Sequence, residues 1–241
     1  MSGAVVRNVG DSQRRTAQPS TDRASRVTRS LLGYGLLAGP FYVAIVLVQA
    51  LTRPGFNLSR DDASLLSNGN MGWIQVANFL LTGLLVIACA VGVRRALSSG
   101  RGAVGGPLLL AIYGVGLIGA GLFAADPMNG FPPGAPAGRP ASITTHGLLH
   151  ITFAGVGFVS FVAACFVLAR RFSGEGRRGW ARFSVATGTI FLAAFAGVAS
   201  GSSSPLIVGA FWAGLIVARA WIGLLSRHLY SRTGTSHEIS G

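Results

Sequence analysis

Six runs of apolar residues dominate the chain, and polar segments separate them. Each run approaches the roughly 20 residues that an α-helix needs to cross a hydrocarbon core of about 30 Å. The runs cover approximately residues 31–51, 72–92, 107–125, 147–169, 183–199 and 206–225. This pattern predicts an all-α fold, a polytopic six-helix transmembrane bundle.

The composition supports lipid as the main solvent of the chain. Hydrophobic residues make up 50% of the sequence and charged residues only 11%, and the mean hydropathy is +0.54. Soluble domains carry about a quarter charged residues. We therefore expect an integral membrane protein.

The basic residues indicate the orientation. There are 20, all of them arginine, against 7 acidic residues, which gives a net charge of +13. Most lie before the first run, in the second and fourth connections and at the C-terminal end, whereas the odd connections hold only Arg53, Arg60 and Arg139. The positive-inside rule then places both termini in the cytoplasm. We expect membrane lipids rather than nucleic acid as partners, since the charge follows the topology.

The polar ends of the chain predict tails. Residues 1–30 are rich in Arg, Ser and Thr and predict a disordered cytoplasmic tail, and residues 226–241 predict a second one. The six-span domain would occupy 31–225. Arg219, inside the last run, is expected to snorkel to the cytoplasmic head groups, although a buried functional arginine is the alternative.

Small and polar residues within the runs indicate how the helices meet. Gly35 and Gly39 have the spacing of a close helix contact, and such faces could also support a homo-oligomer. Gln75, Asn78 and Thr82 share one helical face, which should point into the bundle. That face predicts either hydrogen bonds between helices or, in a transporter, a polar pathway. The two cysteines, Cys89 and Cys165, are expected to pack as small apolar residues.

The candidate site is the segment 126–150, a loop rich in Pro and Gly that opens with Asp126 and closes with His146 and His150. The two histidines, four residues apart, lie on one face of a helix, and the positive end of the helix dipole favours their neutral form. A carboxylate and two imidazoles could supply three zinc ligands with an open position. Asp62, in the other long outer loop, is a further candidate catalytic carboxylate.

A structural alternative stands beside this one. Gly147 occupies the position where the common zinc-protease motif has glutamate, so the histidine spacing by itself is a weak signal. The aspartate and the histidines could instead form a hydrogen-bonded clasp that pins the loop. Asp62 would then cap a short helix from Asp61 to about Leu66.

Three strings in this region carry a family resemblance: Asp-Pro, Phe-Pro-Pro-Gly and His-Gly-Leu-Leu-His. With the first outer loop they resemble the bacterial Domain of Unknown Function 998 membrane family, over approximately residues 30–228. The resemblance implies a six-helix bundle in a bacterial plasma (inner) membrane and makes Asp126, His146 and His150 signature positions. It implies no activity and no cofactor.

Three functions are compatible with these observations. The first is a membrane protein of uncharacterised role with an outward-facing Asp/His cluster. The second is a metal-dependent hydrolase that acts on a lipid or lipid-linked substrate, with zinc as the expected ion. The third is a small transporter.

Overall fold

The computed structural model describes residues 5–235, and the side chains of residues 23–233. Six long helices and one short 3-10 helix follow one another along the chain, and all six long helices are long and apolar enough to cross a membrane. The elements are α1 (Val5–Thr52), η1 (Ala63–Ser67), α2 (Gly72–Ala96), α3 (Gly105–Leu122), α4 (Thr145–Gly174), α5 (Arg178–Ala199) and α6 (Pro205–Thr235). The predicted all-α six-helix bundle is confirmed.

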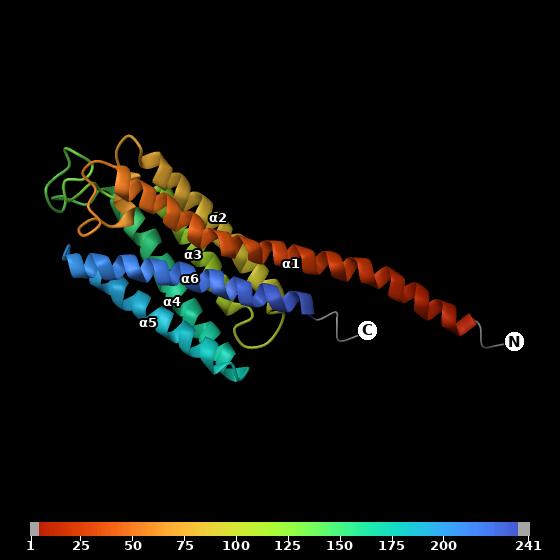
Figure 1. Cartoon of the computed structure of the whole chain (residues 1–241). Helices are drawn as coiled ribbons and strands as arrows, with labels where there is room; N and C mark the ends of the chain where they lie inside the picture. Colours follow the sequence, from red (N-terminus) through yellow and green to blue (C-terminus); the bar gives the residue numbers. More distant parts are fainter. Residues whose placement is uncertain (1–4, 236–241) are drawn as a thin grey trace.

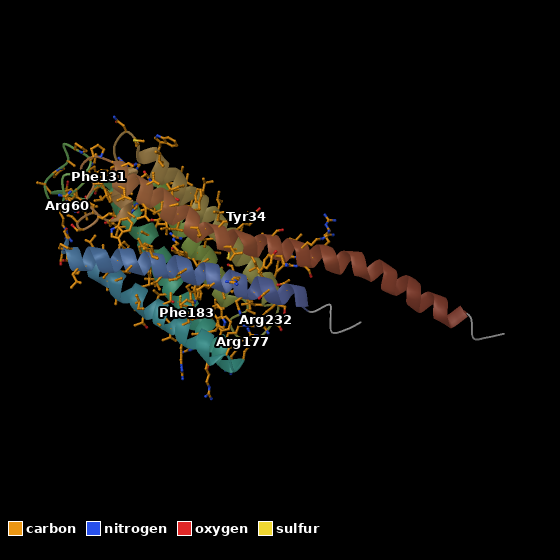
Figure 2. The ribbon with its side chains drawn as sticks, viewed as in Figure 1. Tyr34, Arg60, Phe131, Arg177, Phe183 and Arg232 are labelled. Carbon is orange, nitrogen blue, oxygen red and sulfur yellow. The ribbon has the colours of Figure 1, made fainter. Side chains whose placement is uncertain are left out.

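The helices form a closed ring (Figure 1). Each one packs against the next in sequence, and α6 packs against α1. Connections 53–71, 123–144 and 200–204 gather at one end, which we call the loop end; connections 97–104 and 175–177 lie at the other, the arginine end. Arg60 and Phe131 mark the loop end, and Arg177 and Arg232 the arginine end (Figure 2).

The helices extend further than the sequence predicts. The N-terminal segment, for which a disordered tail was predicted, is helical from Val5 onward, and α6 continues to Thr235 through most of the second predicted tail. Extending a helix that an apolar segment has already nucleated costs far less than starting a new one. Residues 1–4 and 236–241 of the two predicted tails lie outside the described residues.

Glycines bring the helices into close contact within the chain. A side chain at Gly39 would meet the backbone oxygen of Arg219 at 3.1 Å, and one at Gly35 would collide with Ser226, so this face of α1 packs on α6. On α3, a side chain at Gly116 would come within 2.7 Å of the Cα atom of Gly157 on α4. The glycines that suggested a homo-oligomer are therefore already in contact inside one chain.

The polar face of α2 points inward and joins helices, as one of the two sequence interpretations predicts. Gln75 Oε1 accepts hydrogen bonds from Gln49 Nε2 of α1 at 3.0 Å and from Asn78 Nδ2 at 3.2 Å. Asn78 Nδ2 also donates to the backbone oxygen of Tyr42, and Thr82 Oγ1 donates to Asn78 Oδ1. These side chains hold α1 and α2 together in a medium that offers no water.

Aromatic side chains fill the bundle from its middle toward the arginine end. The rings of Phe161 and Trp221 meet edge to face with centroids 5.6 Å apart, and Phe191 packs on Phe161 at 5.2 Å. The buried Trp221 indole donates to Ser184 Oγ at 3.0 Å. Cys165 is buried and free, as predicted. This packed half contrasts with the half beneath the loops.

Candidate functional site

Asp126 binds a threonine rather than a histidine. Its Oδ2 accepts from the backbone N–H of Thr144 at 2.9 Å, and its Oδ1 accepts from Thr144 Oγ1 at 2.5 Å. Thr144 Oγ1 in turn accepts from the backbone N–H of Gly147 at 3.0 Å, and thereby caps α4. The carboxylate lies at the positive end of the α4 dipole.

The glycine in His-Gly-Leu-Leu-His makes this arrangement sterically possible. A Cβ atom at Gly147 would lie only 2.1 Å from Asp126 Oδ2. A glutamate here, as in the zinc-protease motif, would displace the aspartate from the helix terminus. The glycine that weakened the metal interpretation therefore has a structural role.

His150 binds the C-terminal end of α3. It is only 5% exposed, and its Nδ1 atom lies 2.9 Å from the backbone oxygen of Ala120 and 2.8 Å from that of Phe123. Both partners are acceptors, so Nδ1 must carry the hydrogen. The last carbonyls of a helix have no partner within the helix. His150 of α4 thus satisfies the end of α3, just as Asp126 satisfies the start of α4.

His146 has a different environment. It is exposed, and its ring contacts the Phe123 ring edge to face with centroids 5.6 Å apart. Among residues 23–233, no group of three or more His, Cys, Asp or Glu side chains is placed to hold a metal ion. The structure therefore does not assemble Asp126, His146 and His150 into the predicted zinc ligand set in the region it describes.

Asp62 caps the short helix, as the structural alternative predicts, although that helix begins at Ala63 and is of the 3-10 type. Asp62 Oδ1 accepts from the backbone N–H of Ser64 at 2.9 Å and from its hydroxyl at 2.5 Å. Its neighbour Asp61, where the short helix was expected to begin, is fully buried and binds Arg60 through both carboxylate oxygens. Hydrogen bonding to Asp61 raises the pKa of Arg60.

Arg53 ties the two long loops into one unit, which we call the loop cap (residues 53–71 and 123–144). Its guanidinium donates to the backbone oxygens of Leu66 and Asn68 in the first loop. It also lies 4.8 Å above the centroid of the Phe131 ring in the second loop. Partial burial lowers the pKa of Arg53. The third arginine of this end, Arg139, lies over Gly201 in the turn between α5 and α6.

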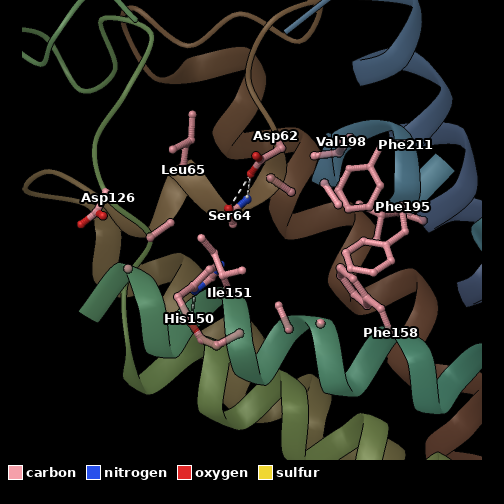
Figure 3. A pocket seen from close by; sticks show the side chains of 18 of the residues that line it. Asp62, Ser64, Leu65, Asp126, His150, Ile151, Phe158, Phe195, Val198 and Phe211 are labelled. Atoms are coloured by element: carbon pink, nitrogen blue, oxygen red, sulfur yellow. Dashed lines mark hydrogen bonds between the residues drawn. The ribbon is translucent and has the colours of Figure 1, made fainter. Parts of the chain in front are cut away.

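A cavity of about 560 Å³ lies beneath the loop cap. Its mouth includes Asp62 and Asp126, and its floor includes Tyr42, Tyr113 and Arg219. Its wall is mainly apolar; in Figure 3, His150 and Ile151 project from α4, and the rings of Phe158, Phe195 and Phe211 gather on one side. The volume falls within the range of about 300–1,000 Å³ typical of small-molecule sites.

Arg219 is buried, as the alternative to snorkelling predicted. Snorkelling was expected, but its side chain is only 3% exposed and lines the cavity. The guanidinium carbon lies 4.2 Å from the ring centroid of Tyr42 and 5.4 Å from that of Tyr113, and these contacts hold it inside the bundle. The signal in the sequence was an arginine within an apolar run.

Comparison with known families agrees with this architecture. The family model described as "Protein of unknown function (DUF998)" matches residues 36–228, from α1 through most of α6. The chain belongs to the DUF998 family. No curated protein and no solved structure matches the chain. The DUF998 match covers all six membrane helices, the loop cap and the cavity, but assigns no activity to them.

Proposed function

We propose that this DUF998 protein binds a lipophilic small molecule in the cavity beneath its loop cap. The observation that supports this most directly is the cavity itself, because a well-formed pocket with mostly apolar walls and a few polar groups is the usual form of a ligand site. The packed aromatic residues below support its floor, since the Phe161 ring packs on the Tyr113 ring with centroids 5.2 Å apart.

The rim of the cavity supports entry from the bilayer. Ile143 and Ile151 both line the cavity, yet they are 61% and 57% exposed. Ile151 lies within α4, a candidate membrane span, so its exposed surface faces the region where lipid is expected. A lipophilic ligand could therefore reach the cavity without crossing water.

The other two functions have less support. The polar face expected to form a transport pathway is engaged in hydrogen bonds between α1 and α2, and Gln75, Asn78 and Thr82 do not line the cavity. The hydrolase needs a metal centre, whereas Asp126 and His150 already bind helix termini. No specific observation favours the transporter or the hydrolase.

Filling the cavity tests the proposal. Ala154 lines the cavity on α4, and Val156 on the same helix is 53% exposed and lies outside the lining. In nanodiscs, saturable binding of radiolabelled 1-dodecanol should fall at least about tenfold in Ala154→Phe, the scale of losing one well-filled subsite. The matched control Val156→Phe should bind like the wild type. Equal binding by the two variants, or uptake no greater than that of protein-free nanodiscs, would refute the proposal.

The orientation is a second part of the proposal. We propose that the arginine end faces the cytoplasm of a bacterium and that the loop end faces outward, since the arginine-rich connections all lie at one end. Reporter fusions at Asn129 and at the C-terminus should then report opposite sides of the plasma membrane. Matching signals from the two fusions would disprove this orientation.

A further inference from the structure

The floor of the cavity holds a buried positive charge that forms no ion pair with the described residues. None of the three guanidinium nitrogens of Arg219 makes a hydrogen bond with the described residues, and no ion pair there includes it. Arg219 lies about 20 Å along α6 from Pro205 at 1.5 Å per residue, far from the head-group region at the loop end. This charge lies deep in the span and lines the cavity.

The tyrosine contacts explain the position of Arg219 but do not offset the free-energy cost of burying its charge. The gain of a desolvated cation over an aromatic face is smaller than the free energy that an ion loses when it leaves water. The rings of Tyr42 and Tyr113 cannot accept the hydrogen bonds that the guanidinium edge offers. The Tyr113 hydroxyl lies close enough to interact with the Arg219 guanidinium but makes no well-aligned hydrogen bond with the described residues, and Tyr113 lines the same cavity.

The carboxylates of the cavity do not neutralise this arginine. Asp62 is bound by Ser64, and Asp126 is bound by Thr144 at the mouth. Between the mouth and the floor the wall is apolar, with Leu117 and Phe211 among its residues. The polar floor beneath an apolar wall therefore complements a molecule with an anionic group at one end and an apolar body.

We propose that Arg219 is an anion-binding residue and that the ligand is an amphiphile with a single oxyanion group, such as a carboxylate. Its oxyanion would reach the floor, where the guanidinium offers two parallel N–H donors and Tyr113 offers a hydroxyl. The apolar chain would lie along the wall toward the mouth. This inference rests on the proposed function and adds the chemical class of the ligand to it.

Three probes test the ligand class on the wild-type protein in nanodiscs at alkaline pH. Radiolabelled dodecanoate should bind about tenfold or more tightly than 1-dodecanol, which matches it in chain length but carries no charge. Unlabelled acetate should not compete at concentrations where dodecanoate does. Equal affinity for acid and alcohol would overturn the inference but leave the proposed function intact, and binding of neither probe would refute both. If acetate competed as effectively as dodecanoate, the site would be one for small anions, and the assignment of an amphiphile as the ligand would be overturned.

Variants then locate the oxyanion. Arg219→Gln should weaken dodecanoate binding about tenfold to a hundredfold, a much larger loss than for dodecanol, whereas Arg219→Lys should retain part of the preference for the acid. Arg139→Gln tests the mouth as the alternative position of the anion, since Arg139 also lines the cavity but is exposed there. It should change dodecanoate affinity by less than about twofold. A loss in Arg139→Gln equal to that in Arg219→Gln would place the anion at the mouth and overturn the assignment. The comparison of the two probes on the wild type remains decisive if Arg219→Gln does not fold.

Discussion

The polar groups at the mouth of the cavity are hydrogen-bonded by the protein, whereas the arginine at its floor is not. At the mouth, Asp126, His150 and Asp62 each bind a helix terminus through hydrogen bonds within the protein. At the floor, Arg219 is more deeply buried than either carboxylate, yet its nitrogens make no well-aligned hydrogen bond in the region described.

The difference separates structural polar groups from a ligand-binding one. A buried polar group that the fold satisfies contributes stability, and its removal leaves the partner atoms unpaired. A buried charge that the fold does not satisfy costs stability until something else binds it. Substitutions at the two places should therefore change the free energy of unfolding with opposite signs.

The largest effect is expected at His150. His150→Ala removes a buried ring and leaves the backbone oxygens of Ala120 and Phe123 without their donor, which should lower the free energy of unfolding by about 2–4 kcal/mol. Denaturant unfolding of the purified protein measures this. Treatment of the wild type with a metal chelator should leave its unfolding unchanged, because hydrogen bonds rather than a metal hold this end. A chelator effect as large as the substitution would restore the zinc interpretation.

The opposite sign is expected at the floor. Arg219→Met should raise the free energy of unfolding of the ligand-free protein by about 1–3 kcal/mol, because the desolvation cost of the unpaired ion exceeds the gain from the tyrosine rings. The same denaturation assay, run after removal of bound amphiphile, gives the comparison. A loss of stability would mean that the contacts with Tyr42 and Tyr113 make the arginine structural, and the distinction between mouth and floor would fail.

A smaller loss is expected at the start of α4. Asp126→Ala and Thr144→Val should each lower the free energy of unfolding by about 1 kcal/mol, the usual value of a helix cap. Because both residues belong to one chain of hydrogen bonds, the double variant should lose less than the sum of the two. Strictly additive losses would show that the two side chains act independently.

The sequence predicted the bundle well because lipid imposes a simple rule on it. A chain that crosses a hydrocarbon core must satisfy its backbone within helices, so six apolar runs of sufficient length define six helices. The inward direction of Asn78 could also be predicted, since a polar face is costly in lipid. Helix ends were less predictable: α3 stops at Leu122, three residues earlier than expected, where His150 from another helix binds its last carbonyls.

The partners of the site residues could not be predicted from the sequence, because they depend on contacts between segments. Asp126 was expected to meet the histidines across the loop, but the backbone N–H of Thr144 competes for it at the α4 terminus. The sequence could not decide between snorkelling and burial of Arg219, because that choice depends on which neighbours surround the side chain. Only the fold reveals that Tyr42 and Tyr113 flank it.

The smallest effect is expected at His146, and it separates two residues that the sequence treated as a pair. His146 is exposed and contacts the Phe123 ring edge to face, whereas His150 is buried and hydrogen-bonded. Replacement of an exposed side chain away from such hydrogen bonds usually changes the free energy of unfolding by less than about 0.5 kcal/mol, so His146→Ala should unfold like the wild type and bind the lipophilic probe equally well. Should His146→Ala instead lose as much stability as His150→Ala, the two rings would act together, and the division between a bonded mouth residue and a free surface residue would have to be abandoned.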